Sequence, residues 1–209
     1  MLRILIADDH DVVRRGLRQI LKEEFLGAYI VEVADADDLF GRVLKEDWDL
    51  VISDLSMPGR SGLEVLQQIH QEFPKLPILV LSIYPEDLYA IRVMRAGASG
   101  YLNKELASEE LVKAVHRVLL GKKYITPALA EKLADTLDRD AEKLAHENLS
   151  DREFEVMKLL ATGMPVAEIA ENMGLSPTTV STYRARILLK MNVRTNADLT
   201  RYAMEHNLL

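Results

Sequence analysis

The chain has 209 residues, of which 48% are hydrophobic and 28% charged, and its formal net charge is −7. This length suggests two domains, each able to bury a core, and the absence of cysteine excludes disulfides and thiolate metal sites. No apolar run approaches the ~20 residues needed to cross a bilayer, and Met1 leads directly into a strand-like segment rather than a signal peptide. We therefore expect a cytoplasmic protein with no membrane partner, whose metal, if any, is held by carboxylates, carbonyls or histidine.

The charge is unevenly distributed along the chain. Residues 1–122 carry 15 Lys and Arg against 20 Asp and Glu, whereas residues 149–209 carry seven of each. Within the second region, residues 176–197 contain no acid and hold four basic residues: Arg184, Arg186, Lys190 and Arg194. Local clustering matters more than the total charge for contact with phosphates, so this span is a candidate nucleic-acid contact.

The first part of the chain alternates strand-like and helix-like segments. Short apolar runs at residues 2–7, 29–34, 50–54, 77–81 and 99–102 are typical of buried strands. Helical spacing of apolar residues follows at residues 11–24, 37–45, 62–73, 86–95 and 108–120, with Asp11 as the expected N-cap of the first helix. This order predicts an α/β domain with a doubly wound, five-stranded parallel sheet of the flavodoxin-like kind.

Polar side chains follow four of the predicted strands. Asp8 and Asp9 follow the first strand, Asp54 ends the third, Ser82 follows the fourth and Lys104 the fifth. In a doubly wound sheet these positions lie on one edge, around the crevice where the strand order reverses. Taken alone, the acid pair could cap a helix and the lysine could be a solvated surface residue. Taken together, they predict one pocket.

The predicted pocket suits phosphoryl chemistry. A carboxylate such as Asp54 is an available nucleophile for a phosphoryl group. Clustered acids repel one another by roughly 1–4 kcal/mol a pair, so a cation must offset them. Mg²⁺ or Mn²⁺ would suit Asp9, Asp54 and one backbone carbonyl as ligands. Asp8 would act through a metal-bound water, or as a hydrogen-bond acceptor for the groups around the metal ligands. Lys104 would pair with phosphoryl oxygens, and the Ser82 hydroxyl would bond to one of them.

Four motifs here resemble the receiver domain of bacterial response regulators over residues 1–122. They are Ile6-Ala7-Asp8-Asp9-His10, Asp54-Leu55-Ser56-Met57-Pro58-Gly59, Leu81-Ser82 and Gly100-Tyr101-Leu102-Asn103-Lys104. The resemblance implies a regulator, not an enzyme, in which Asp54 accepts a phosphoryl group from a sensor histidine kinase with Mg²⁺. It also implies that Asp9 and the Ser56 carbonyl ligate the metal, and that Ser82 and Tyr101 rearrange on phosphorylation.

An enzymatic interpretation uses the same pocket. Haloacid-dehalogenase-type phosphatases also place an aspartate nucleophile at a strand tip, but they need a second acid two residues later. That position is Ser56 in this chain. We therefore expect the aspartyl phosphate to persist as a signal.

Residues 123–146 are expected to form a largely helical linker. Thr126 is a plausible N-cap, Pro127 suits the first helical position, and the polar stretch runs to about Leu144. Alternating charges favour a solvated connector, while packing of this segment against either domain is the open alternative.

Residues 147–209 show short helical patterns without strands, which predicts a small all-α domain. Ser150 and Glu153 have the spacing of a capping box, and Gly163 ends the helix that follows. A second helix is predicted over residues 166–173, and a third begins at Ser176-Pro177 and runs to about Met191. Gly174 supplies the turn between them, so the pattern fits a helix-turn-helix.

The third helix is the predicted recognition helix. Its buried stripe is Val180, Ile187 and Met191. The opposite face, expected to enter the major groove, consists of Thr178, Ser181, Thr182, Ala185 and Arg186. Residues expected nearer the phosphates are Ser176, Thr179, Arg184 and Lys190. Sequence readout would then rest on short hydroxyls, on Ala185 against a thymine methyl, or on DNA shape.

Several motifs of this region resemble the LuxR-type helix-turn-helix, so the whole chain resembles a response regulator of the NarL/FixJ family. They are Leu149-Ser150-Asp151-Arg152-Glu153, Glu168-Ile169-Ala170, Thr179-Val180 through Ile187, and Lys190-Met191. Two positions depart from the pattern, since many relatives have Lys in place of Ser181 and His in place of Tyr183.

The resemblance also implies the partners of this region. The last helix, residues 196–206, would pair two domains through Leu199, Tyr202 and Ala203, although packing within the domain is an open alternative. Implied partners are inverted-repeat sites in double-stranded promoter DNA, RNA polymerase, and a second copy when phosphorylated. A protein–protein adaptor is the alternative from another functional class.

Overall fold

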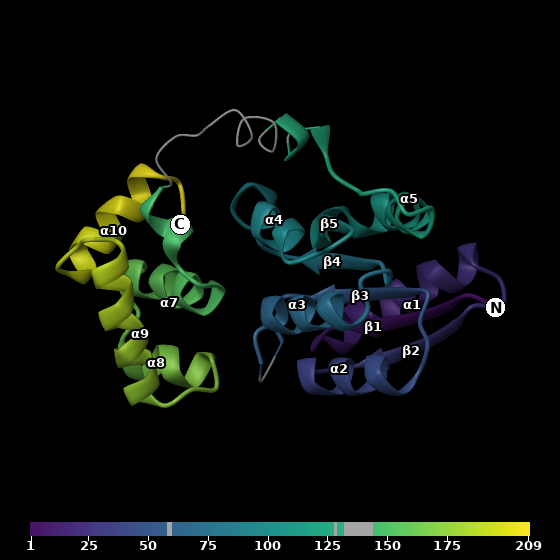
Figure 1. Cartoon of the computed structure of the whole chain (residues 1–209), viewed down its shortest axis with the longest axis horizontal. Helices are drawn as coiled ribbons and strands as arrows, with labels where there is room; N and C mark the ends of the chain where they lie inside the picture. The colour runs from purple at the N-terminus through teal and green to yellow at the C-terminus, as the bar shows by residue number, and fades with distance from the viewer. Residues whose placement is uncertain (58–59, 128, 132–143) are drawn as a thin grey trace. The chain divides into compact units, whose positions relative to one another are not determined.

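The structure, a computed structural model, describes residues 1–57, 60–127, 129–131 and 144–209 (Figure 1). The chain divides into two units, Met1–Asp138 and Arg139–Leu209, which are described separately. The finer division into residues 1–122, 123–146 and 147–209 stays a prediction. No helix among the described residues has both the length and the apolar character needed to cross a membrane.

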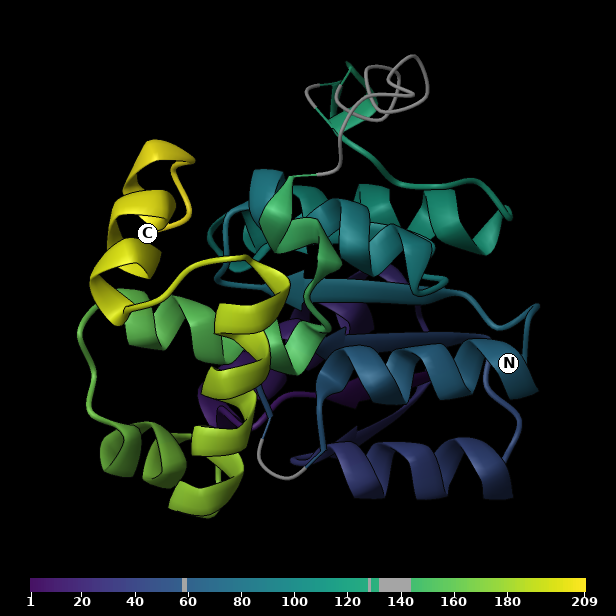
Figure 2. The same ribbon diagram turned by 60° about the vertical axis from the view of Figure 1, so that its left-hand side comes forward.

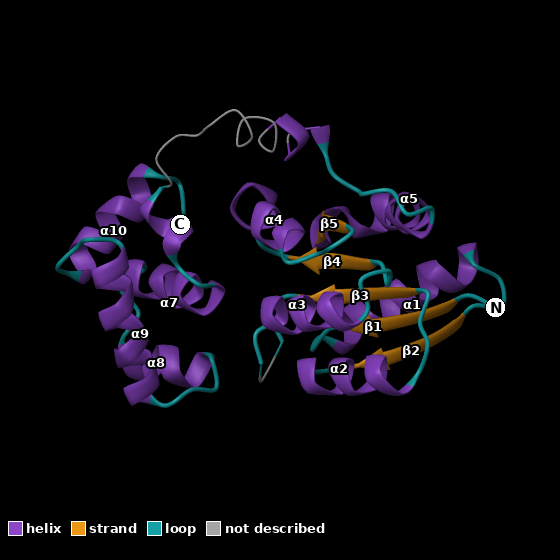
Figure 3. Ribbon diagram, viewed as in Figure 1, coloured by secondary structure: helices purple, strands orange, loops and turns teal. Residues whose placement is uncertain are grey.

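The first unit is built on a parallel sheet of five strands in the order β2-β1-β3-β4-β5 (Figure 3). The strands are β1 (Arg3–Ala7), β2 (Tyr29–Val33), β3 (Leu50–Asp54), β4 (Ile78–Ser82) and β5 (Gly100–Asn103). β1 therefore pairs with β2 on one side and with β3 on the other, and the strand order reverses there. The predicted doubly wound sheet is confirmed, and its switch point lies where Asp8 and Asp54 end neighbouring strands.

Five α-helices accompany the strands over residues 1–119, together with the short 3₁₀ helix η1 (Lys104–Leu106). They are α1 (Asp11–Glu24), α2 (Ala36–Lys45), α3 (Gly62–Glu72), α4 (Glu86–Arg95) and α5 (Ala107–Leu119). Leu17 and Leu21 of α1 and Leu111 and Val115 of α5 pack against alternate residues of the strands. Figure 1 shows α2 and α3 in front of the sheet, so both faces are covered, and the inner strands β1, β3 and β4 are largely hydrophobic on both sides.

Two local features of the backbone shape the crevice edge. The N-cap of α1 is His10, not Asp11 as expected; Asp11 is the first helical residue and pairs with Arg15 at 2.9 Å. Gly62, where α3 begins, lies so close to the loop after β3 that a Cβ would stand 2.4 Å from the Leu55 carbonyl oxygen. Only glycine fits there, and this close approach fixes Leu55, the residue directly after Asp54, against the start of α3.

The start of the predicted linker packs on the first unit. The Tyr124 amide donates to the Ser99 carbonyl at 2.8 Å, and its hydroxyl donates to Glu110 at 2.9 Å. Thr126 donates to Glu86 at 2.8 Å and accepts from the Leu129 amide at 3.2 Å, which confirms its capping role. The expectation of a solvated connector is therefore wrong for these residues, because Tyr124 extends the β5 edge. The rest of the predicted helical stretch, residues 132–143, lies outside the described residues.

The second unit is entirely helical over its described residues. It consists of the 3₁₀ helix η2 (Ala145–Asn148) and of α7 (Asp151–Ala161), α8 (Val166–Asn172), α9 (Pro177–Lys190) and α10 (Asn196–Glu205). The Ser150 amide donates to Glu153 at 2.7 Å, and the return bond to the serine hydroxyl confirms the capping box. α9 packs against both α7 and α8, and α10 packs against α7 (Figure 2). The predicted helix-turn-helix is thus confirmed.

Candidate functional site

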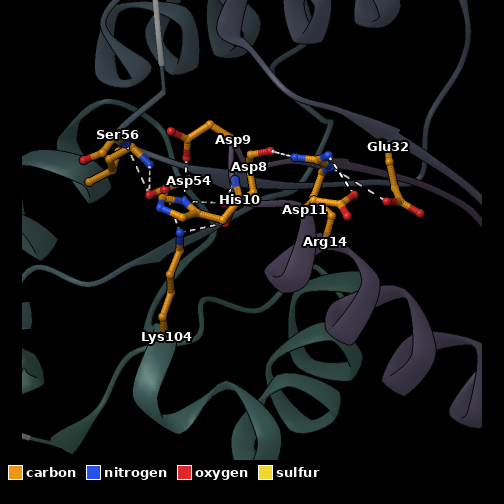
Figure 4. A network of polar contacts seen from close by, with 10 residues as sticks. Asp8, Asp9, His10, Asp11, Arg14, Glu32, Asp54, Ser56 and Lys104 are labelled. Carbon is orange, nitrogen blue, oxygen red and sulfur yellow. Dashed lines mark hydrogen bonds and ion pairs between the residues drawn. The ribbon is translucent and has the colours of Figure 1, made fainter. Parts of the chain in front are cut away.

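The carboxyl edge of the sheet brings together three acids and the Lys104 ammonium, whose side chain is 11% exposed. Lys104 Nζ lies 2.6 Å from Asp54 Oδ2 and 2.6 Å from Asp8 Oδ2. Asp8, Asp9, His10 and Asp54 each offer a ligand atom, and these atoms all lie within 4.8 Å of one another (Figure 4). The predicted convergence of three acids and a lysine from β1, β3 and the end of β5 is confirmed.

Asp54 is held tightly at the tip of β3. Its side chain is 3% exposed, and Oδ1 accepts hydrogen bonds from the Leu55 amide at 2.6 Å and the Ser56 amide at 3.2 Å. Burial raises the pKa of Asp54 above its usual value of 3.8, and the attraction of Lys104 only partly opposes this. The backbone therefore holds Oδ1, whereas Oδ2 is paired with the Lys104 ammonium and could exchange this partner for another group.

Lys104 is a cation that the pocket makes harder to deprotonate. Burial by itself lowers the pKa of this ammonium, but its bonds to Asp54 and Asp8 raise the pKa by more, so the net shift is upward. The lysine is therefore charged at neutral pH. Its charge offsets the repulsion between the two buried carboxylates.

Asp8 and Asp9 differ in surroundings although they are adjacent in sequence. Asp8 is 1% exposed, and its Oδ1 accepts from the His10 amide at 2.9 Å. The Asp9 side chain is 30% exposed, with Oδ1 2.6 Å from His10 Nδ1. The two oxygens of Asp8 are thus engaged by His10 and Lys104, while Asp9 faces the open side. The role of Asp8 at a metal ion stays a prediction.

The two predicted switch residues share one neighbour. Ser82 is fully buried, and its hydroxyl accepts from the Tyr84 amide at 3.2 Å. Tyr101 is 1% exposed and donates its hydroxyl proton to the Tyr84 carbonyl at 2.7 Å. Burial raises the pKa of Tyr101 well above its usual value of 10. Both side chains therefore hold the loop after β4, and their rearrangement on phosphorylation stays a prediction.

Three residues of this network were not predicted from the sequence. His10 lies beside the acids, and Arg14 donates to the Asp8 carbonyl at 2.6 Å (Figure 4). Tyr84 joins the two switch residues. The adjacency of His10 to Asp8-Asp9 was a usable signal. Nothing in the local pattern marks Tyr84 or Arg14, because their roles depend on how the loop and α1 fold back on the strand ends.

The pocket has the donor set that a small divalent cation requires. All three acids provide hard oxygen ligands, the kind that Mg²⁺ prefers. Oxygen atoms that bind one ion at about 2.1 Å lie at most about 4.2 Å apart, so a set within 4.8 Å needs only a small adjustment. The residues present therefore fit a Mg²⁺ or Mn²⁺ ion.

The outward face of α9 in the second unit agrees with the predicted orientation. Val180, Ile187 and Met191 are buried, as expected for the stripe that packs on α7 and α8. All five residues assigned to the opposite face are exposed: Thr178, Ser181, Thr182, Ala185 and Arg186. Leu189, 81% exposed, follows them at helical spacing and was not predicted.

The four residues predicted near phosphates have protein partners of their own. The Ser176 hydroxyl accepts from the Thr179 amide at 3.1 Å and lies 2.8 Å from the Thr179 hydroxyl, so it caps α9. Arg184 Nε donates to Asn196 at 2.7 Å. Lys190 donates to Glu153 at 2.6 Å. The two basic side chains are therefore oriented by the domain itself.

The Lys190–Glu153 pair joins α9 to the capping box of α7. Glu153 is 3% exposed, whereas the Lys190 side chain is 40% exposed. Burial raises the pKa of Glu153, but Lys190 and Ser150 lower it by more, and the net value lies below the usual 4.5. Lys190 thus stabilises the domain while part of its surface remains open to solvent.

The predicted dimer contacts on α10 are wrong for two of three residues. Leu199 and Ala203 are fully buried within their own unit, so the alternative of packing inside the domain holds for them. A single amphipathic helix does not distinguish a stripe that packs on α7 from one that packs on a partner. Tyr202 is half-buried, with its hydroxyl 3.0 Å from His146 Nδ1.

Comparison with family models gives two matches. Residues 4–116 match the model described as "Response regulator receiver domain", and residues 147–203 match "Bacterial regulatory proteins, luxR family". The first match contains the whole acidic pocket and the second contains α7 to α9 and most of α10.

Characterised relatives match over the full length. The chain is 35% identical to the response regulator UvrY of Escherichia coli over 100% of this chain and 96% of that one. It is 33% identical to the response regulator GacA of Pseudomonas aeruginosa, covering 100% and 98% of the two chains. A solved structure of RcsB from Salmonella enterica serovar Typhimurium, bound to promoter rprA with phosphomimetic BeF3⁻, is similar at 30% identity and a TM-score of 0.65, covering 97% and 98%.

Proposed function

Because this chain belongs to the NarL/FixJ family of two-component response regulators, with a receiver domain and a LuxR-type DNA-binding domain, we propose that Asp54 is its phosphoryl acceptor. The observation that carries the proposal is the placement of Asp54 Oδ2 beside Lys104, at 2.6 Å, in a pocket shared with Asp8 and Asp9. Charge and position are then provided by the fold before the phosphoryl group arrives.

In this proposal a phosphohistidine of a sensor kinase is the donor. Asp54 Oδ2 attacks phosphorus, the new O–P bond forms, and the N–P bond to the kinase histidine breaks. The Leu55 and Ser56 amides keep Oδ1 fixed, and Lys104 moves from Oδ2 to the phosphoryl oxygens. A Mg²⁺ or Mn²⁺ ion held by Asp9, Asp54 and the Ser56 carbonyl would supply positive charge that offsets the phosphoryl oxygens.

The signal then passes to Ser82 and Tyr101. The Ser82 hydroxyl, fully buried at the tip of β4, would turn from the Tyr84 amide to a phosphoryl oxygen. Because Tyr101 also bonds to Tyr84, this change would move the loop that holds the tyrosine. A phosphoryl group changes the balance of states only through such differential contacts.

We also infer that the aspartyl phosphate is long-lived. The position two residues after Asp54 is Ser56, whose hydroxyl is a poor general acid in comparison with a carboxylic acid. Rapid turnover by this chain is therefore not expected, and the family is one of transcription regulators.

Phosphorylation is tested by incubating the full chain with acetyl phosphate and Mg²⁺ and measuring acid-labile phosphate. The wild type and the control Asp11→Asn, altered at an exposed residue beside the pocket, should incorporate phosphate equally. Asp54→Asn should incorporate none, and Asp9→Asn should need far more Mg²⁺. Undiminished labelling of Asp54→Asn would contradict the assignment.

We further propose that the exposed face of α9 reads promoter DNA. Its support is the combination of five exposed residues, 178, 181, 182, 185 and 186, with a span that contains no acid from residue 176 to residue 197. Arg184, oriented by Asn196, and Lys190 would contact phosphates, as would the hydroxyls of Ser176 and Thr179 at the start of α9. This arrangement follows the docking geometry of helix-turn-helix proteins.

The DNA contact is tested with a genomic fragment selected by the phosphorylated chain. Arg186→Ala should weaken specific binding by about 1–3 kcal/mol. Arg184→Ala should reduce the slope of the logarithm of the binding constant against the logarithm of the salt concentration by about 1. Arg15→Ala removes an exposed positive charge from α1, in the other unit, and serves as the control. If Arg186→Ala binds as tightly as the control, the α9 face is not the reading surface.

A homodimer is the proposed active form. Its contacts on α10 would differ from those expected from the sequence, because Leu199 and Ala203 are buried within the unit. Ala197, Arg201 and Met204 are exposed and follow one another at helical spacing, so they form the free face of this helix. Met204→Glu should lower the fraction of dimer in sedimentation measurements on the phosphorylated chain. An unchanged fraction would place the dimer contact elsewhere. RNA polymerase remains the expected further partner at the promoter.

A further inference from the structure

His10 lies at the open side of the acidic pocket and was not part of the predicted site. Its Nδ1 lies 2.6 Å from Asp9 Oδ1 and 3.2 Å from Asp8 Oδ1, and its side chain is 65% exposed. Figure 4 shows the imidazole among the three carboxylates. One ring nitrogen thus belongs to the same cluster as the oxygens of Asp8, Asp9 and Asp54, all within 4.8 Å.

The backbone holds this imidazole in place. The His10 amide donates to Asp8 Oδ1 at 2.9 Å, and the His10 carbonyl accepts from the Arg14 amide at 3.1 Å as the first bond of α1. His10 is therefore anchored between the tip of β1 and the start of a 14-residue helix. Because the anchor is short, the ring nitrogen stays within reach of the carboxylates.

A ring nitrogen changes which metals the pocket favours. Sites made only of carboxylate and carbonyl oxygen suit Mg²⁺ and Mn²⁺, whereas imidazole suits Ni²⁺, Cu²⁺ and Zn²⁺. Ligand atoms of one such ion, bound at about 2.1 Å, lie at most about 4.2 Å apart. Closing a set that spans up to 4.8 Å needs movements of a few tenths of an ångström, which the partly exposed Asp9 and His10 side chains permit.

We propose that His10 is a nitrogen ligand in this pocket and adds affinity for a transition-metal dication such as Ni²⁺ or Cu²⁺ without adding affinity for Mg²⁺. His10 Nδ1, which contacts the Asp9 and Asp8 carboxylates, would then contact the metal ion instead. Mg²⁺ does not require the imidazole, because oxygen ligands and water complete its shell. This inference rests on the divalent-cation site of the proposed function.

The experiment is calorimetric titration of the full-length chain, without an affinity tag, with NiCl₂ and separately with MgCl₂. His10→Asn should weaken Ni²⁺ binding tenfold or more and leave Mg²⁺ affinity within twofold. His116→Asn, which alters an exposed histidine paired with Glu24 at 2.9 Å, should change neither affinity. Excess Mg²⁺ should weaken Ni²⁺ binding by the wild type, since both ions would share Asp9 and Asp54.

Electron paramagnetic resonance with Cu²⁺ provides a second readout. The wild type should show hyperfine coupling to an imidazole nitrogen that is absent from His10→Asn. If Mg²⁺ binds but His10→Asn leaves Ni²⁺ affinity and the nitrogen coupling unchanged, the inference about His10 is overturned. If neither Mg²⁺ nor Ni²⁺ binds the wild type, and Asp9→Asn behaves identically, the cation site of the proposed function is overturned as well.

Discussion

Replacing Lys104 by methionine removes the only ammonium that the described structure places between two buried carboxylates. Asp8 Oδ2 and Asp54 Oδ2 each lie 2.6 Å from Nζ, so they are no more than twice 2.6 Å, that is 5.2 Å, apart. Two unit charges about 5 Å apart repel by about 3 kcal/mol at the effective dielectric typical of protein sites, and the attraction of Lys104 to both carboxylates offsets that repulsion. The substitution removes both attractions and leaves the repulsion in place. Because removing one partner of a buried ion pair costs roughly 3–5 kcal/mol, we expect Lys104→Met to lower the free energy of unfolding of the receiver by about 3 kcal/mol at pH 7 with Mg²⁺ chelated.

The chain contains a matched probe for this measurement. Trp48, the sole tryptophan, is 9% exposed in the first unit, and its ring N–H donates to the Arg42 carbonyl at 3.2 Å. Its fluorescence during urea unfolding reports on the receiver without interference from the second unit. Saturating Mg²⁺ should restore part of the lost stability, because a divalent cation also offsets the two carboxylates.

A double-mutant cycle isolates the electrostatic part of the effect. In the Asp54→Asn background only the Asp8 carboxylate remains beside Lys104, so Lys104→Met should cost less stability than in the wild-type background. A loss below 1 kcal/mol for the single variant would refute the reasoning. So would an equal loss in both backgrounds, since that would assign the effect to packing of the lysine stem.

Three further predictions concern stability. Burial raises the pKa of Asp54 in the folded state, so ionisation of this carboxyl lowers the stability of the receiver as the pH rises through that pKa. Asp54→Asn should therefore raise the free energy of unfolding at pH 7, and the gain should vanish toward pH 3.8. The pKa of Glu153 is lowered in the folded state, so its ionised form stabilises the second unit above pH 4.5, and this stabilisation is lost as the pH falls through the folded-state pKa. Lys190→Met should therefore lower the free energy of unfolding by about 1–3 kcal/mol at pH 7 and by less at pH 4, as measured by circular dichroism of the helical unit. Gly62→Ala should cost about 1–3 kcal/mol by tryptophan fluorescence, because its Cβ would meet a carbonyl oxygen at 2.4 Å, whereas Gly16→Ala, with open space around it, should not destabilise the receiver. A smaller loss for Gly62→Ala than for Gly16→Ala, or pH-independent effects in the other two variants, would contradict these arguments.

The fold was predictable because the inner strands β1, β3 and β4 are largely apolar on both faces, and because each strand is followed by a helix of regular spacing. The predicted helix at residues 86–95 agrees with α4 at both ends, and the strand ends differ from prediction by about one residue. The pocket followed from the same pattern. Once the strands are parallel, the residues at their carboxyl ends meet on one edge, whatever the packing details.

What could not be predicted depends on neighbours distant in sequence. The apolar stripe of α10 contains Leu199 and Ala203, and nothing in that helix says whether α7 or a second copy covers it. Lys190 looked like a free basic residue because its partner Glu153 is 37 positions away. Tyr124 lies in a polar stretch, and only the structure shows that it bonds to Ser99 and Glu110.

Phosphorylation of Asp54 should increase DNA binding by the second unit. This effect is tested most directly by fluorescence anisotropy of one selected promoter fragment with the wild type and Asp54→Asn, each with and without acetyl phosphate and Mg²⁺. We predict at least tenfold tighter binding by the wild type when acetyl phosphate is present, and no response by Asp54→Asn. An equal response by both chains, or none by a wild type shown to be phosphorylated, would contradict the account.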